Sequence, residues 1–299
     1  MSGAVIEIQS LTKRFGGTTA VDELSFRVEP GVVTGFLGPN GAGKTTTLRS
    51  LVGLVRPTSG RATFDGKAYG ELAEPLRTVG TALEAASFHP GRSGRDHLRV
   101  VGAAAGIPTS RVDEVLDRVG LADAARRRVG GYSLGMRQRL GLAFALLGDP
   151  GALVLDEPIN GLDPEGIRWI RGFLRDLAAE GRTVLVSSHL LSEVQQTVDR
   201  VVIISRGRLA YEGTLDGLEK GTSTRVHVDA SDRDALARAL QAAGAHVESS
   251  ADGLRVAGLD AAAIGERALA AGIALTLLVP EREGLENVFL EIVGEGGIR

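Results

Sequence analysis

A glycine-rich segment follows a short apolar run near the start of the chain and precedes a predicted helix. It reads Gly38-Pro39-Asn40-Gly41-Ala42-Gly43-Lys44-Thr45, between the β-branched run Val32–Leu37 and a helix expected over Thr45–Gly53. A strand, a glycine loop and a helix in this order point successive backbone N–H groups and the helix N-terminus at one anion. The spacing of the last glycine, the lysine and the threonine therefore predicts a phosphate-binding loop at the end of a parallel sheet.

Each residue type in this loop has a chemical purpose. Glycines let the backbone approach an anion closely, and Lys44 brings a compact positive charge to the β- and γ-phosphates of a nucleotide. Thr45 offers a hydroxyl oxygen, which suits Mg²⁺. The alternative, a glycine-rich turn without a ligand, does not account for the lysine, the threonine and both flanking elements. The residues predicted to bind the nucleotide are Gly38, Pro39, Asn40, Gly41, Ala42, Gly43, Lys44, Thr45 and Thr46.

Two adjacent acids follow a second apolar run. Leu153–Leu155 predicts a short buried strand, and Asp156 and Glu157 come directly after it. We expect Asp156 to orient Mg²⁺ through water, and Glu157 to align the attacking water or to accept its proton. Two acids at this position also suit a solvated strand end, but the phosphate loop upstream favours the catalytic interpretation.

Apolar strands alternate with helices over residues 1–220. This alternation predicts an α/β fold in which helices cover a parallel sheet. Strands are expected at Ala4–Ile8, Leu24–Val28, Val32–Leu37, Arg61–Phe64, Leu153–Leu155, Thr183–Ser187, Val201–Ser205 and Arg208–Gly213, the last two as a hairpin around Gly207. Helices are expected at Thr45–Gly53, Arg111–Val119, Arg137–Leu147, Glu165–Glu180 and Ser192–Val198.

The pattern changes after about Gly221, where the predicted elements follow the order β-α-β-β-α-β. That order is typical of a ferredoxin-like α+β domain. The elements are expected at Thr224–Val228, Arg233–Ala243, His246–Ser249, Gly253–Val256, Ala261–Ala271 and Ala274–Val279, with a final amphipathic helix at Leu285–Ile292. The sequence thus predicts two domains, residues 1–220 and 221–299, of which the second is a small accessory domain.

Composition excludes several classes of protein. The 299 residues include no cysteine, so disulfides, thiolate catalysis and cysteine-based metal sites are ruled out. A net charge of −3 gives no reason to expect a nucleic-acid partner. No uncharged run approaches the roughly 18 apolar residues of a membrane span, and the N-terminus does not resemble a secretory signal. We therefore expect a chain that does not cross a bilayer by itself.

Three further segments, together with the phosphate loop and the acid pair, give the sequence a family resemblance. Residues 132–138, Tyr-Ser-Leu-Gly-Met-Arg-Gln, look like a variant of the LSGGQ signature, and residues 158–164, Pro-Ile-Asn-Gly-Leu-Asp-Pro, look like a D-loop. Residues 187–189, Ser-Ser-His, follow a predicted strand and look like a switch histidine segment. In order and spacing, these segments resemble the nucleotide-binding subunits of ABC transporters. The resemblance covers about residues 4–220 and extends more weakly to the rest.

The resemblance implies a P-loop ATPase domain with a helical subdomain that works in pairs. In this family two such domains stack head to tail, and ATP lies between the phosphate loop of one and the signature of the other. Ser133, Gly135 and the D-loop acid Asp163 would then serve the site of a second copy of this chain or of a related ATPase subunit. Phe15 would stack on the adenine, and His189 would contact the γ-phosphate.

Simpler interpretations of three of these residues stay open at this point. Ser133 is a good helix N-cap residue, and we expect it to be both a cap and a ligand. His189 taken alone is equally compatible with a structural histidine, and Phe15 with a core phenylalanine. The other histidines are expected to be structural.

The sequence also departs from the family pattern. Most relatives carry a glutamine between the phosphate loop and the signature, where this chain has Glu84. A carboxylate there still offers oxygen to Mg²⁺, but it cannot donate a hydrogen bond. Leu134 and Met136 replace a glycine and a glutamine of the signature. With residues 80–90, 132–143 and 187–195, these departures resemble a narrower group: the ATPases of bacitracin-resistance and lantibiotic-immunity exporters, with the daunorubicin-type exporters as close relatives.

The resemblance implies a subunit that hydrolyses ATP to power a separate polytopic membrane subunit of an exporter, at the cytoplasmic face of the cell membrane. The expected cargo is an antibiotic, a peptide or a drug-like molecule. ATP would close the dimer and hydrolysis would reset it. The segment Leu285–Ile292 resembles the last helix of the small domain in these ATPases, for which we expect a dimer-stabilising or partner-docking role. The alternatives are a non-transport ABC ATPase acting in translation or DNA repair, another P-loop enzyme such as a kinase, and an importer.

Overall fold

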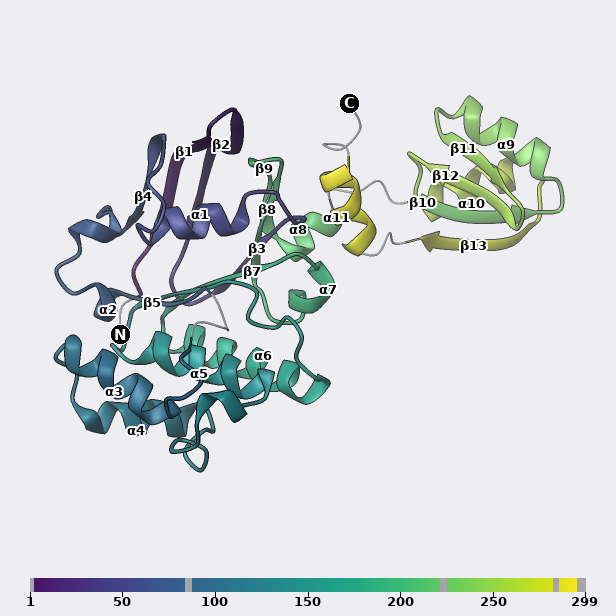
Figure 1. Ribbon diagram of the computed structural model, residues 1–299. Helices are drawn as coiled ribbons and strands as arrows, with labels where there is room; N and C mark the ends of the chain where they lie inside the picture. Colours follow the sequence, from purple (N-terminus) through teal and green to yellow (C-terminus); the bar gives the residue numbers. More distant parts are fainter. Residues whose placement is uncertain (1–2, 84–87, 221–224, 282–284, 295–299) are drawn as a thin grey trace. The chain divides into compact units, whose positions relative to one another are not determined.

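The structure is a computed structural model that describes residues 3–83, 88–220, 225–281 and 285–294 (Figure 1). The chain divides into two compact units, Met1–Thr214 with Ile292–Arg299, and Leu215–Glu291. Within the described parts of the chain, no helix combines the length and the apolar character that a membrane span requires.

The first unit is built on a six-stranded sheet with the strand order β5-β6-β7-β3-β8-β9. All neighbouring strands are parallel except the hairpin of β8 and β9. Every residue of β3, β6 and β7 is buried, as their apolar sequences predict. The carboxyl ends of these three strands therefore meet at one edge of the sheet. The strands are β3 (Val33–Leu37), β5 (Val79–Ala82), β6 (Ala152–Leu155), β7 (Thr183–Ser188), β8 (Arg200–Ser205) and β9 (Arg208–Thr214).

The first unit also contains a second sheet, which is antiparallel and has the strand order β2-β1-β4. Its strands are β1 (Ile6–Phe15), β2 (Thr18–Val28) and β4 (Ser59–Phe64). The predicted strands Ala4–Ile8 and Leu24–Val28 were too short, because three register shifts between β1 and β2 interrupt the apolar alternation. Phe26 of β2 packs on Phe36 of β3 with ring centroids 5.1 Å apart, so the two sheets share one core.

Helices of the first unit lie on both sides of the main sheet (Figure 1). In Figure 1, α1 lies next to the three-stranded sheet, whereas α3, α4 and α5 lie together on the other side of the main sheet. These three form a helical subdomain, and α6 packs against β3 and β7. The helices are α1 (Lys44–Leu51), α2 (Pro75–Thr78), α3 (Gly94–Ala104), α4 (Thr109–Arg118), α5 (Leu134–Leu146), α6 (Pro164–Ala179) and α7 (Leu191–Val194), with 3-10 turns at Tyr69–Glu71 and Val129–Gly131.

Several helices differ from their sequence predictions, and the short helices α2 and α8 (Leu215–Lys220) were not predicted. The helix α3 was not predicted, because Gly94 and Gly102 lie within it and lower its helical propensity. The helix α5 begins at Leu134, three residues before the predicted start, since Ser133 caps it. The segment predicted as a helix over Ser192–Val198 is a helix only at α7, and it continues as a turn in which the Thr197 N–H donates to the Val194 carbonyl.

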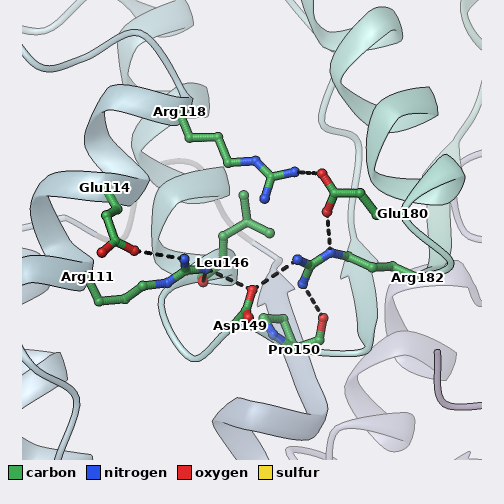
Figure 2. Close-up of polar contacts among 8 residues, drawn as sticks. All are labelled: Arg111, Glu114, Arg118, Leu146, Asp149, Pro150, Glu180 and Arg182. Atoms are coloured by element: carbon green, nitrogen blue, oxygen red, sulfur yellow. Dashed lines mark hydrogen bonds and ion pairs between the residues drawn. The ribbon is translucent and has the colours of Figure 1, made fainter. Parts of the chain in front are cut away.

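An ion-pair network joins α4 to the amino ends of β6 and β7 (Figure 2). The side chain of Arg182 is only 2% exposed and donates to Asp149 and Glu180, at 2.9 Å each, and to the Pro150 carbonyl at 2.6 Å. From α4, Arg111 reaches Asp149 at 2.9 Å, and Arg118 pairs with Glu180. Each of the two acids thus takes two arginines, and the helical subdomain is fastened to the sheet.

An aromatic stack joins α5 to α6. Trp169, the one tryptophan of the sequence, stacks on Phe173 with ring centroids 4.9 Å apart. The guanidinium of Arg139 on α5 lies 4.1 Å from the centroid of the Trp169 ring, and that of Arg118 on α4 lies 5.8 Å from the Phe173 centroid. The stack therefore connects two helices of the helical subdomain to α6.

The second unit holds a four-stranded antiparallel sheet with the order β11-β12-β10-β13. Its elements follow the predicted succession: β10 (Arg225–Ala230), α9 (Arg233–Ala242), β11 (His246–Ser250), β12 (Gly253–Ala257), α10 (Ala261–Ala270) and β13 (Leu275–Glu281). Asp232 and Asp260 cap the two helices by accepting backbone N–H groups. Alternate residues of β10 pack against α9 and α10 in a separate apolar core. The remaining helices are α8 (Leu215–Lys220) and α11 (Leu285–Gly294).

Candidate functional site

The glycine-rich loop connects β3 to α1 as predicted, and its conformation requires glycine at Gly43. Gly43 has φ +103° directly before α1, and a Cβ atom there would lie 2.5 Å from the Ala20 carbonyl oxygen. Gly41 also has a positive φ, +82°. The loop therefore curls back over the start of α1 and leaves the first N–H groups of that helix free to bind an anion.

Lys44 begins α1 and turns its side chain back toward the loop. Its ammonium donates to the carbonyls of Gly38 at 2.6 Å and Pro39 at 3.3 Å. The side chain is 6% exposed, and burial lowers the pKa of Lys44, while the nearby carboxylates of Glu157 and Asp156 act in the opposite direction. The loop thus holds a buried cation whose partners are mostly neutral carbonyl oxygens.

Asp156 directly follows β6, and both of its carboxylate oxygens accept hydrogen bonds. Oδ2 accepts a hydrogen bond from the Thr45 hydroxyl at 3.0 Å, and Oδ1 accepts one from the Ser187 hydroxyl at the end of β7. A hydroxyl and a carboxylate side by side are the oxygen ligands that Mg²⁺ prefers. The donor chemistry of Thr45 and Asp156 therefore fits a magnesium ion bound together with phosphate.

Glu157 adopts a backbone conformation that is uncommon for a residue with a side chain, with φ +49°. Its carboxylate lies between two basic groups: Oε1 is 3.7 Å from Lys44 Nζ, and Oε2 is 2.9 Å from His189 Nδ1. The side chains of Glu157 and His189 are 25% and 27% exposed. The acid is therefore held in place and stays accessible to water.

A third side chain lies beside this pair. Glu157, His189 and Glu193 each offer a ligand atom, and these atoms lie within 4.8 Å of one another. That spacing would also suit a metal ion, but the two carboxylates already have protein partners. Glu157 faces Lys44 and His189, and Glu193 accepts a hydrogen bond from Ser188 at 2.8 Å.

The loop, the acid and the histidine enclose a cavity of about 380 Å³. Of the predicted site residues, it is lined by Pro39, Asn40, Gly41, Gly43, Lys44, Thr45, Thr46, Glu157 and His189, and also by Ala20 and Asn160. Gly38 and Ala42 belong to the loop without lining the cavity. Asp156 lines a neighbouring cavity of about 370 Å³ with Leu134 and Gln138 at the start of α5.

Phe15 lies at the tip of the β1–β2 hairpin, and its side chain is 52% exposed. The ammonium of Lys13 lies 4.7 Å from the centroid of its ring. The alternative that Phe15 is a core residue is therefore wrong. An exposed ring on a hairpin is available for stacking on a planar ligand.

Ser133, Gly135 and Asp163 do not line the loop cavity. Ser133 Oγ accepts the Met136 N–H at 3.2 Å at the start of α5, and Asp163 Oδ1 accepts the Gly166 N–H at 2.8 Å at the start of α6. Ser133 and Asp163 are both exposed. Ser133 is thus an N-cap, as expected, and its role as a ligand stays a prediction. Glu84 lies outside the described residues, so its predicted metal contact also stays a prediction.

Ala20, Asn160 and Ser187 belong to the site but were not predicted from the sequence. Asn160 lines the loop cavity, and Ser187 contacts both acids, since its Oγ also accepts the Glu157 N–H at 2.9 Å. The signal for Ser187 was available: a polar residue ends an apolar strand two positions before His189. The carboxyl ends of parallel strands lie at the same edge of a sheet, so Ser187 could have been expected to lie close to Asp156 and Glu157.

Comparison with known proteins agrees with this geometry. The family model described as "ABC transporter" matches residues 21–160, and a model described as "Domain of unknown function (DUF8746)" matches residues 224–286. The chain is 36% identical over 301 residues to the bacitracin transport ATP-binding protein BcrA of Enterococcus faecalis, covering 98% of both chains. It is 38% identical to the lantibiotic transport ATP-binding protein SrtF of Streptococcus pyogenes, covering 72% of this chain and 93% of SrtF.

A solved structure titled "Structure of ATP binding subunit of ABC transporter" resembles the first unit with a TM-score of 0.65. It is 26% identical and covers 72% of this chain and 92% of its own. The family resemblance of the sequence is thus confirmed by the fold, the phosphate loop and a relative that matches along nearly the whole chain. The chain belongs to the ATP-binding proteins of the ABC transporter family, and its first unit is an ABC ATPase domain that hydrolyses ATP.

Proposed function

We propose that this chain is the ATP-hydrolysing subunit of an exporter whose membrane-spanning part is a separate protein. The cargo class is an antibiotic, a peptide or a drug-like molecule, which the names of the bacitracin and lantibiotic relatives support. The chain acts at the cytoplasmic face of the cell membrane, and two ATPase subunits close on ATP to move the membrane subunit. Nucleic acid is not among its partners.

The structural observation that carries this proposal is the separation of two groups of residues. The loop cavity holds Lys44, Glu157 and His189, whereas Ser133 and Asp163 are exposed and do not line it. Ser133 and Gly135 stand at the start of the 13-residue helix α5, where free N–H groups favour an anion. This separation supports a dimer in which Ser133, Gly135 and Asp163 of one subunit complete the ATP site of the other.

Hydrolysis uses the groups around the cavity. Lys44 and the N–H groups of residues 38–46 hold the β- and γ-phosphates, and Phe15 stacks on the adenine. Glu157 accepts a proton from the attacking water, whose oxygen forms a bond to the γ-phosphorus while the bond to the bridging oxygen of ADP breaks. His189 holds the Glu157 carboxylate at 2.9 Å and contacts the γ-phosphate. Thr45, Asp156 and, as the family resemblance implies, Glu84 would hold Mg²⁺, which would supply positive charge to the phosphates.

We propose that residues 221–299 act as an accessory domain of the ATPase domain of residues 1–220. The antiparallel order β11-β12-β10-β13, reached through two β-α-β crossings, supports a ferredoxin-like type. The role that we propose for it is to stabilise the dimer or to dock a partner.

The first experiment is a tagged pull-down from native membranes in mild detergent, with mass spectrometry of the proteins that copurify. A polytopic membrane protein in near-equal amount is the expected result. A homodimer without a membrane protein, or copurified ribosomal proteins, would contradict the exporter and favour a non-transport ATPase.

The dimer is tested with Ser133→Arg, which places a bulky cation at the start of α5. We expect nucleotide binding by the monomer to persist and ATP-driven dimers to disappear in size-exclusion chromatography. Dimers formed by this variant would contradict the cross-subunit role of Ser133. Resistance to bacitracin or a lantibiotic, measured with the copurified membrane protein and this chain expressed together, tests the cargo class, with Glu157→Gln as the inactive control.

A further inference from the structure

Ser187 is a fully buried hydroxyl residue near the end of β7, and one oxygen atom connects it to both acids of the site. Its Oγ donates to Asp156 Oδ1 and accepts the Glu157 N–H at 2.9 Å. A serine hydroxyl has one hydrogen to give. Because the Glu157 N–H can only donate, the hydrogen of Ser187 must go to Asp156, so the direction of both bonds is determined.

We propose that Ser187 is a positioning residue for ATP hydrolysis, which sets the orientation of the Asp156 carboxylate and the backbone of Glu157 together. This proposal rests on the roles proposed above for Asp156 and Glu157. Ser187 lines neither the loop cavity nor the neighbouring cavity, so among the described residues it acts through these two acids and does not touch the nucleotide.

The Asp156 carboxylate is held at both oxygens, and each bond has a different function. Ser187 holds Oδ1 from the side of β7, which leaves Oδ2 facing the Thr45 hydroxyl at 3.0 Å. Without Ser187, the Thr45 hydroxyl alone holds the carboxylate, which can then rotate more freely about its Cβ–Cγ bond. The oxygen that faces the phosphate loop would then be placed less precisely for the metal ion and phosphate.

Glu157 needs support because its backbone is in the left-handed region, at φ +49°. The last paired residues of β6 and β7 are Leu155 and Val186, so Glu157 lies beyond the regular ladder. The Ser187 hydroxyl supplies the acceptor that the ladder no longer offers. A non-glycine residue in this conformation is retained only when its surroundings hold it there, and this hydrogen bond fixes the direction in which the carboxylate leaves the strand.

The test compares Ser187→Ala with Ser187→Thr in ATPase assays of the full chain. Ser187→Ala removes both hydrogen bonds, and we expect kcat to fall about 10- to 100-fold, the range typical of residues that orient metal ligands. KM for ATP should change less than kcat, and the Mg²⁺ concentration for half-maximal activity should rise. Ser187→Thr keeps the hydroxyl and should restore most of kcat.

Thr183→Val is the matched control. Thr183 lies at the other end of the same strand, is also fully buried, and donates to the Ala4 carbonyl at 2.7 Å. Its loss removes a buried hydrogen bond of β7 far from the acids, so we expect a lower melting temperature and an unchanged kcat. A Ser187→Ala variant with wild-type kcat, or one in which kcat falls no more than in Thr183→Val, would overturn the proposal.

If Ser187→Ala does not fold, Ser187→Cys keeps a weaker donor and acceptor of similar size at the position. We expect its kcat to lie between those of wild type and an inactive protein, with the same rise in the Mg²⁺ requirement. Wild-type kcat and Mg²⁺ requirement in Ser187→Cys would overturn the proposal. Glu157→Gln tests the proposed role of Glu157 separately from that of Ser187. If this variant hydrolyses ATP at the wild-type rate, Glu157 is not the proton acceptor, whatever the effect of the Ser187 substitutions.

Discussion

Strands β6 and β7 have charged residues at both ends. At one end these residues pair with one another, and at the other end they face a cavity. At the amino ends, Arg182 pairs with both Asp149 and Glu180, and each of these two acids also pairs with a second arginine (Figure 2). At the carboxyl ends, Glu157 is shared between Lys44 and His189 and faces a cavity. Permanent partners make the first cluster structural, whereas a carboxylate and a cation that face open space are free to meet a ligand.

The difference also shows in how each end treats a buried cation. Arg182 gives its guanidinium to two carboxylates and a carbonyl, which satisfies a charge that would be costly to bury alone. Lys44 is nearly as buried, but its closest partners are two neutral carbonyls. A cation in that setting gains most from a bound phosphate, because phosphate oxygens can form charge-assisted hydrogen bonds with the ammonium.

The largest expected effect comes from Glu157→Gln at the carboxyl ends. The amide cannot accept the proton of water, so we expect kcat for ATP hydrolysis to fall about 10²- to 10⁴-fold. ATP binding should persist, and dimers should accumulate in the presence of ATP, measured by phosphate release and size-exclusion chromatography.

Glu193→Gln is the control for this variant, because Glu193 is a nearby carboxylate whose partner is Ser188. We expect it to keep most of the activity. Ordinary turnover in Glu157→Gln, or an equal loss in both variants, would contradict the assignment of Glu157 as the proton acceptor.

The next effect is expected at the amino ends, from Arg182→Met. Removing one partner of a buried ion pair typically costs 3–5 kcal/mol. We expect about 3 kcal/mol, the lower end of that range, because Asp149 keeps Arg111 and Glu180 keeps Arg118. Urea denaturation followed by circular dichroism measures this loss.

The activity of Arg182→Met should equal that of wild type at temperatures where the variant is folded, since the network lies at the other ends of the strands. Arg27→Met removes an arginine from an exposed pair with Glu29 and is expected to leave stability unchanged. If Arg182→Met were as stable as wild type but had a reduced kcat, the amino-end network would not have a purely structural role.

Lys44→Ala is expected to weaken ATP binding while leaving the fold intact. Charge-assisted hydrogen bonds contribute about 1.5–3 kcal/mol each, so Kd should rise about 10- to 150-fold. Isothermal titration calorimetry measures this change, and Lys67→Ala, at an exposed lysine, should bind ATP like wild type. Unchanged binding by Lys44→Ala would refute the phosphate loop as the site.

The smallest effect is a pH dependence. Burial lowers the pKa of Lys44 below its usual 10.5, so the free protein loses this charge at a lower pH than an exposed lysine would. Because phosphate binds the charged form, Kd for ATP should rise as pH rises through the window below 10.5, by at most about tenfold per pH unit. Stability of the free protein should move the other way and increase, since the unfolded chain holds the proton more tightly there.

Binding measured from neutral to alkaline pH tests this prediction, with Lys44→Ala as the control that lacks the titrating group. A flat profile in wild type, or an equal slope in the variant, would show that Lys44 is not the group responsible.

The parts of the site that the sequence predicted share one property: their residues are neighbours in the chain. The phosphate loop, Asp156 with Glu157, and the N-cap Ser133 are each defined by a few consecutive residues beside an apolar run. Their local geometry follows from strand, loop and helix order, and the structure places the first two groups around adjoining cavities.

The parts that sequence analysis missed depend on residues far apart in the chain. Arg182 meets Asp149 across 33 positions, and the Ser187 hydroxyl meets Asp156 across 31 positions. Neither spacing carries a periodicity. The helix α3 and the strand β5 were missed for another reason, since β5 has only four residues and α3 contains two glycines. In both elements, packing against α5 outweighs local propensity.

The stack of Arg139, Trp169 and Phe173 gives the protein a spectroscopic label of its own. The sequence has one tryptophan, so its emission comes from a single indole, and that indole lies on α6 beneath a cation carried by α5. Indole emission shifts with the electric field across the ring, and a guanidinium 4.1 Å from its centroid is a strong source of field. A change in the distance between the two helices would therefore shift the emission wavelength, and such a shift can be measured in unlabelled protein.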